Sequence, residues 1–354
     1  MSEVLETSQS VEETKKKGGL GLFEKLLPIW IVICMAVGIL LSLYAPSIAE
    51  TIDGWQVRGI SIPIGICLFF MMYPAMLNLK ASELKKLAKN PKPIILTLIS
   101  NWIIAPFVGW GLARLFVPGN EQLMFAIILL ASSPCTAMVL VWGYMADGNQ
   151  EQNVITTSIN TLTIMIGYAP MVVLLSGISN ISIDVVSLII SVAFFIGIPL
   201  ILGIVTRVLI VRAKGEEWFK NKFVPVVGKI SIVALLTTLV VLFSLNGNVM
   251  ISNFNLLLLV SVPLLLGFII VVGYNLLITR FTKLAYKEGV ITVIIGSSSH
   301  FEIAIATAIA IYGVGSVAAL GTTMGLFWEI PIMVGLVYLA KFLKKKNWWK
   351  ETPT

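Results

Sequence analysis

Charged side chains are scarce in this sequence. Only 12% of its 354 residues are charged and 57% are hydrophobic, whereas a soluble chain carries about 25% charged residues. Lipid must therefore face most of the surface. The sequence also lacks a GxxxxGK[ST] phosphate-binding loop. This excludes an ATP-hydrolysing domain of that type on this chain, and no ATPase subunit is evident.

Cysteine and histidine are scarce too. Cys34, Cys67 and Cys135 lie far apart, each within an apolar stretch, and His300 is the one histidine. No CxxC pair or zinc-ligand spacing occurs, so the sequence indicates neither disulfides nor a metal centre, and no cofactor is expected. Any thiol chemistry must come from a single cysteine.

Long apolar runs, by contrast, are abundant. A membrane-spanning helix needs about 20 mostly apolar residues, and ten segments meet that requirement. We therefore predict an all-α membrane protein with ten transmembrane helices and short loops. Residues 1–24 and 341–354 are interpreted as a disordered and a basic cytoplasmic tail, without a cleaved signal peptide, around a membrane domain at 25–340. The ten segments are 26–44, 59–77, 94–116, 123–145, 154–175, 185–209, 224–245, 256–278, 290–311 and 316–339.

The basic residues lie mainly in alternate loops. Because Lys- and Arg-rich loops stay in the cytoplasm, this pattern predicts that both termini are cytoplasmic in a multi-pass plasma-membrane protein. The net charge of +7 is then a topology signal and implies no nucleic-acid partner. The residues that set this orientation are Lys15–Lys17, Lys25, Lys80, Lys85, Lys86, Lys89, Lys92, Arg207, Arg212, Lys214, Lys220, Lys222, Arg280, Lys283, Lys287, Lys341, Lys344–Lys346 and Lys350.

Two predicted helices contain helix-breaking sequences at matching positions. Helices 1–5 (26–175) and 6–10 (185–339) form halves with an odd number of helices, which predicts two inverted repeats. Helix four breaks at Ser132-Ser133-Pro134-Cys135 and helix nine at Gly296-Ser297-Ser298-Ser299-His300, because proline and glycine–serine runs disfavour helix. Unwound backbone at membrane depth survives only in protein or beside a cavity. Matched breaks therefore predict that helices four and nine cross at a transport site.

Three acidic or imidazole side chains lie within the predicted helices: His300, Glu302 and Glu329. An acid inside the membrane costs at least about 2.5–3.5 kcal/mol, so each is a functional candidate. Glu302, just beyond the helix-nine break, is predicted to couple transport to a proton or cation, the alternative being a structural acid. Glu329 precedes Pro331, and the favoured interpretation is a structural role in which its carboxyl group finds hydrogen-bond partners near the irregularity that the proline causes. His300 is placed with Glu302 as a coupling residue, although a plain interhelical hydrogen bond is the favoured alternative.

Cys135 and nearby hydroxyls are the candidate substrate ligands. A thiolate binds soft elements, and Cys135 lies at the helix-four break, whereas Cys34 and Cys67 are interpreted as packing residues. The hydroxyl candidates are Ser132, Ser133, Thr136, Ser298 and Ser299, each of which has a helix-bonded serine or threonine as its alternative reading.

Several motifs resemble those of the arsenite-efflux permease family, in the bile acid/arsenite/riboflavin transporter superfamily. The similarity covers nearly the whole chain. The motifs are Met71-Met72-Tyr73-Pro74, Asn101-Trp102 with Pro106, Cys135-Thr136-Ala137-Met138-Val139-Leu140-Val141-Trp142, Phe301-Glu302-Ile303-Ala304-Ile305-Ala306 and Glu329-Ile330-Pro331.

The resemblance implies a panel domain, a core domain and crossed broken helices, with arsenite or antimonite exported in exchange for protons. It places the family's essential cysteine at Cys135 and its essential glutamate at Glu302. Pro134 and Ser299-His300 depart from the family pattern, which has Arg and a paired Asn there. The alternative function is a sodium-coupled symporter of an organic anion. A membrane enzyme is disfavoured because no nucleophile–base pair is visible.

Overall fold

The computed structural model describes residues 26–45, 54–57, 60–77, 90–136, 138–252, 254–313 and 315–349, with Ser47 and Thr51. The predicted tail at 1–24, the loop with Lys80, Lys85, Lys86 and Lys89, and the last residues of the predicted basic tail lie outside this part of the chain.

The described chain is almost entirely helical, as its apolar runs predict. Two antiparallel strands of two residues each, β1 (Gln56–Val57) and β2 (Ile60–Ser61), form the one sheet among the described residues. The helices are α3 (Leu27–Tyr44), α5 (Ile62–Leu77), α7 (Lys92–Ile99), α8 (Ala105–Phe116), α9 (Glu121–Ala131), α10 (Met138–Met145), α11 (Gln150–Ile178), α12 (Val185–Val192), α13 (Ile198–Trp218), α14 (Val224–Ser252), α15 (Phe254–Phe281), α16 (Tyr286–Ser297), α17 (Phe301–Tyr312) and α18 (Val317–Lys345), with π-helical turns η2 (Ser100–Ile104), η3 (Ala193–Gly197) and η4 (Phe219–Phe223).

Five helical stretches are long and apolar enough to cross a membrane, and four shorter helices are apolar as well. Since many apolar side chains are also exposed, this is a multi-pass membrane protein. The stretches are Lys92–Phe116, Gln150–Ile178, Val185–Gly247, Phe254–Phe281 and Val317–Lys345, and the shorter helices are Ile29–Tyr44, Ile62–Met71, Glu121–Ala131 and Phe301–Tyr312.

Helix boundaries differ from the predicted ones where local chemistry extends or bends the helix. The last helix continues past Leu339 to Lys345, because lysines in a final helical turn favour the partial negative charge of its carbonyl end. α13 passes a kink at Gly215, whose φ of 84° suits a residue without a side chain.

Asp184 caps α12, and hydrogen bonds from the Ser187 hydroxyl and backbone N–H hold the pKa of Asp184 below its usual range.

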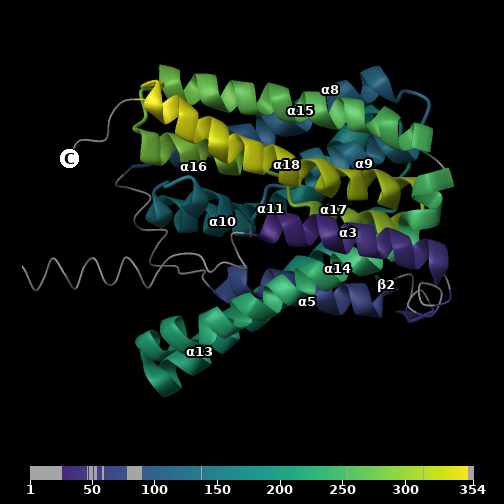
Figure 1. Ribbon diagram of the computed structural model, residues 1–354, viewed down its shortest axis with the longest axis horizontal. Helices are drawn as coiled ribbons and strands as arrows, with labels where there is room; N and C mark the ends of the chain where they lie inside the picture. The colour runs from purple at the N-terminus through teal and green to yellow at the C-terminus, as the bar shows by residue number, and fades with distance from the viewer. Residues whose placement is uncertain are drawn as a thin grey trace, which may run out of the picture.

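The helices pack in two groups. α3, α5, α13 and α14 contact mainly one another, whereas α8, α9, α15, α16, α17 and α18 form a second network with α7, α10 and α11. Figure 1 shows α3, α14, α5 and α13 on one side of the molecule and α8, α15, α18 and α9 on the other. We call these the panel group and the core group. Both predicted broken helices lie in the core group.

Candidate functional site: the crossing of two interrupted helices

The fourth predicted helix is interrupted, as expected. α9 ends at Ala131 and α10 begins at Met138; we call residues 132–136 break one. The Ser133 hydroxyl folds back onto the Leu130 carbonyl at 2.9 Å, and Pro134 has no N–H with which to continue the helix. Cys135 is 2% exposed, and its carbonyl accepts a hydrogen bond from Asn160 Nδ2 at 3.1 Å.

The ninth predicted helix is interrupted as well. α16 ends at Ser297 and α17 begins at Phe301; we call residues 298–300 break two. His300 is the residue before α17, and Glu302 lies in its first turn. A carboxylate there faces the partial positive charge of a helix N-terminus, which lowers the cost of placing an acid inside the protein.

The two breaks pair through their backbones. Pro134 and Ser299 form an antiparallel bridge, and the His300 N–H donates to the Ser133 carbonyl at 2.6 Å. The backbone groups that the two helices leave unpaired thus partly satisfy each other. The pairing brings Ser133 and Ser299 together from positions far apart in the sequence.

Neighbouring helices hold the end of α16. Asn275 Nδ2, on α15, lies 2.8 Å from Ser100 Oγ and 3.0 Å from Ser297 Oγ. Ser100 donates in turn to the Gly296 carbonyl at 2.7 Å. Ser100 begins the π-helical turn η2, an irregularity that is frequent at functional sites.

Glu329 on α18 holds break two from the other side. Its Oε1 accepts hydrogen bonds from Ser298 Oγ at 2.5 Å and from the Ser299 N–H at 3.1 Å, while its Oε2 accepts from Ser299 Oγ at 2.5 Å. Glu329 is 2% exposed. The predicted satisfied contact is confirmed, but its partners were not predicted, because they lie about thirty positions away in the sequence.

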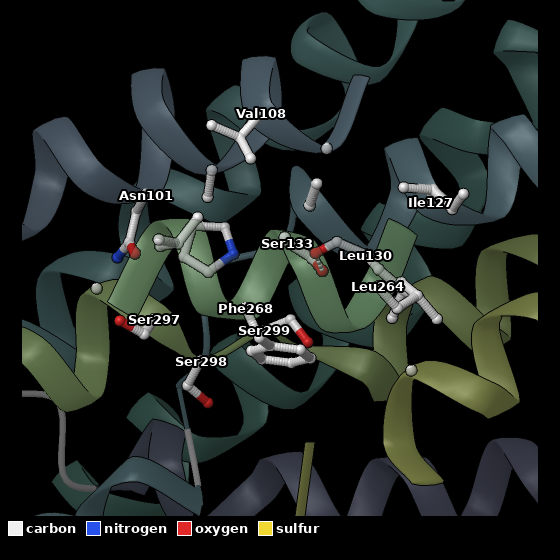
Figure 2. Close-up of a pocket in the computed structure, with 18 of the residues that line it drawn as sticks. Asn101, Val108, Ile127, Leu130, Ser133, Leu264, Phe268, Ser297, Ser298 and Ser299 are labelled. Atoms are coloured by element: carbon white, nitrogen blue, oxygen red, sulfur yellow. Dashed lines mark hydrogen bonds between the residues drawn. The ribbon is translucent and has the colours of Figure 1, made fainter. Parts of the chain in front are cut away.

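A cavity of about 70 Å³ lies beside the crossing, which is room for a few water molecules or one small solute. Of the predicted substrate residues, Ser133, Ser298 and Ser299 line it, together with Asn101 and Ser297. Figure 2 shows these polar side chains with an apolar wall that includes Val108, Ile127, Leu130, Leu264 and Phe268.

The other predicted site residues lie in the two breaks or directly beside them, not in the cavity lining. They are Ser132, Cys135, Thr136, His300 and Glu302, all buried. The Ser132 and Thr136 hydroxyls and Glu302 Oε2 have no hydrogen-bond partner among the described residues. An unsatisfied buried polar group costs about 1–3 kcal/mol, so a concentration of such groups marks a place where a ligand or water contributes contacts.

His300 lies directly against Glu302. Nδ1 of the imidazole is 2.9 Å from Glu302 Oε2, yet the two atoms are not aligned as a hydrogen bond. Neither ring nitrogen bonds to another helix in the described structure, so the favoured interhelical bond is not what the structure shows. Residues two apart meet here because His300 precedes the helix and its backbone is non-helical.

Apolar spans around two interrupted, mutually paired helices define a membrane transport protein. The chain belongs to the sodium bile acid symporter family, whose model matches residues 65–253. It is also similar to the uncharacterised transporter slr0944 of Synechocystis, at 39% identity over 96% of this chain and 93% of that protein.

Two arsenical-resistance proteins Acr3 are similar over nearly the whole chain. The Acr3 of Alkaliphilus metalliredigens is 34% identical over 94% of this chain and 96% of its own. The Acr3 of Corynebacterium glutamicum is 30% identical over 96% of this chain and 94% of its own length. The predicted resemblance to arsenite-efflux permeases is thereby confirmed, and the chain is placed among transporters rather than enzymes.

Proposed function

We propose that this protein is a secondary active transporter that exports arsenite, with antimonite as a second cargo, from the cytoplasm in exchange for protons. The observation that carries the proposal is the crossing of two interrupted helices beside a small cavity that is lined in part by serine hydroxyls and an asparagine amide. The similarity to two arsenical-resistance proteins supports the choice of substrate.

The proposal includes the architecture predicted from the sequence. Ten transmembrane helices form two inverted five-helix repeats in the plasma membrane, with both termini cytoplasmic. The panel and core groups correspond to the two bodies that rock against each other. Their separate packing supports this assignment, because a carrier of this kind alternates access by moving one bundle against the other.

Cys135 and the hydroxyls near it meet the metalloid, and Glu302 with His300 holds the proton. Both sets are buried at the crossing, in breaks that pair with each other. Occupation by one ligand excludes the other as the core group moves. A single thiol with hydroxyls binds weakly enough to release the cargo on the far side, and three-thiolate capture is excluded because one cysteine lies at the breaks.

Proton exchange supplies enough energy for export. Arsenite is largely uncharged at neutral pH, so inward movement of one proton makes the exchange electrogenic. One charge crossing about 100 mV releases about 2.3 kcal/mol, and tenfold accumulation costs about 1.4 kcal/mol. One proton therefore sustains a gradient on the order of fiftyfold.

Arsenite uptake into everted vesicles tests the assignment. We expect Glu302→Gln to reduce uptake at least about a hundredfold, the size of effect expected when a proton-transfer group is lost, and Cys135→Ala to reduce it sharply because the cargo loses its thiol ligand. Cys34→Ala, a half-buried cysteine outside both breaks, is the matched control and should transport normally. Normal transport by both site variants would end the proposal.

The family's name favours one alternative, a sodium-coupled symporter of an organic anion. In that case Glu302, Ser297–Ser299 and backbone carbonyls coordinate sodium. Uptake measured with sodium replaced by choline separates the two functions. If the protein exchanges arsenite for protons, arsenite uptake should not change without sodium. If it is a symporter, uptake of its organic anion should stop without sodium, and replacing Cys135 should have no effect on that uptake.

A further inference from the structure

The hydroxyl groups that line the cavity use their protons elsewhere. The Ser298 hydroxyl donates to Oε1 of Glu329 and the Ser299 hydroxyl donates to Oε2, each across 2.5 Å. Both serines therefore spend their protons on the same carboxyl group. What they present to the cavity is therefore oxygen lone pairs.

The opposite side of the cavity has the same character. The Ser133 hydroxyl donates to the Leu130 carbonyl, and Asn101 Nδ2 donates to Asn160 Oδ1 at 3.2 Å, which leaves their oxygens as the free acceptors. Fewer donors remain: Ser297, whose oxygen accepts from Asn275, keeps its own proton available, and so does the second N–H of the Asn101 amide. Hydrogen-bond acceptors thus outnumber donors around the cavity.

The backbone adds negative potential at the same place. The cavity lining includes the C-terminal ends of α9 and α16, at Leu130, Ala131, Gly296 and Ser297. The last carbonyls of a helix carry a partial negative charge. No basic side chain is present among the residues that the structure places around the cavity. An anion there meets lone pairs and carbonyls, with no basic side chain in the lining to balance its charge, and the partial positive charge at the start of α17 already faces Glu302.

We infer that Glu329 is a specificity-determining positioning residue: it turns the hydroxyls of Ser298 and Ser299 into acceptors, so that the site takes a small neutral ligand that donates hydrogen bonds and rejects anions. This inference rests on the proposed function, since arsenite at neutral pH is such a ligand and arsenate is an anion. A site built around unbalanced hydrogen-bonding groups discriminates strongly, because the wrong ligand leaves them unpaired.

Replacing Glu329 by glutamine reverses one of these bonds. The Glu329→Gln side chain has an amide nitrogen that donates to one serine, which frees the hydroxyl proton of that serine for the cavity. Glu329→Asp keeps a carboxylate that only accepts. The two variants therefore separate the direction of the hydrogen bond from the mere presence of a polar group.

Arsenite transport by purified protein in proteoliposomes, with and without arsenate on the substrate side, tests the inference. We expect Glu329→Gln to raise the KM for arsenite about tenfold, equivalent to one hydrogen bond to a charged group, and to make arsenate an inhibitor. The maximal rate should change little. Glu329→Asp should still exclude arsenate, and Ser298→Ala should raise KM without admitting it.

Glu121→Gln serves as a control because Glu121 lies in the first turn of α9, away from the cavity lining; it should match the wild type. A Glu329→Gln protein with unchanged KM and no arsenate inhibition, but lower yield or melting temperature, would show a purely structural role and overturn the inference. Wild-type protein that transports no arsenite would defeat the proposed function and the inference with it.

Discussion

Break one and break two interrupt two helices in similar ways but are held very differently. Break two is surrounded by side-chain bonds: Glu329 holds residues 298–299, and Asn275 with Ser100 holds the end of α16. At break one, Asn160 donates to the Cys135 carbonyl from a neighbouring helix, and the backbone pairs with break two. Both breaks keep buried polar atoms without hydrogen-bond partners in the described structure: the Ser132 and Thr136 hydroxyls in break one, and the two ring nitrogens of His300 in break two.

The difference suggests a division of work between the breaks. A segment fixed by several buried bonds can serve as a fixed wall of a site, because each bond resists local opening. A segment without a buried carboxyl group that holds its side chains, such as break one, can rearrange around cargo at lower cost. We therefore expect break two to position the cavity and break one, with Cys135, to adjust when the ligand enters.

The largest effect on stability is expected from Asn275→Ala, which removes the bonds to Ser100 and Ser297. We expect the free energy of unfolding to fall by about 2–3 kcal/mol, since two buried hydroxyls each lose a partner. Thermal unfolding of the purified protein in detergent measures this. A loss below about 0.5 kcal/mol, as for an ordinary surface substitution, would mean that break two is not fixed by α15.

A smaller effect is expected from Asn160→Ala, the matching change at break one. It removes the donor to the Cys135 carbonyl and the acceptor for Asn101, and about 1 kcal/mol is expected because the more weakly held segment can relax. Transport should suffer more than stability, since Cys135 loses its support. If Asn160→Ala destabilised the protein as much as Asn275→Ala, the contrast between the breaks would fail.

The fold was largely readable from the sequence because membrane helices follow from local composition. Each of the ten apolar segments contains a helix, and the two breaks appear where Ser-Pro and Gly-Ser runs predict them. The ten-helix inverted repeat and the roles of Cys135 and Glu302 stay predictions. The π-helical turn at Ser100–Ile104 was not predicted, although Pro106 just beyond it lacks the N–H that would bond to the Trp102 carbonyl and is a local signal for such an irregularity.

The contacts that build the site could not be read from the sequence. Which polar group meets Ser298 depends on how α18 packs against α16, and Glu329 was recognised only as an acid that needed a partner. The cavity likewise includes Asn101 and Ser297 but not Cys135. Such long-range pairings arise from packing, whereas sequence patterns report mainly local preference.

Protection of Cys135 by cargo tests the central claim, that the crossing of the two breaks is the transport site. In a Cys34→Ser, Cys67→Ser protein, Cys135 is the one thiol left, and its rate of maleimide labelling in everted vesicles can be measured with and without arsenite. Arsenite should slow labelling in a saturable way, whereas sulfate should not. A labelling rate that arsenite leaves unchanged, in a protein that still transports it, would contradict the account.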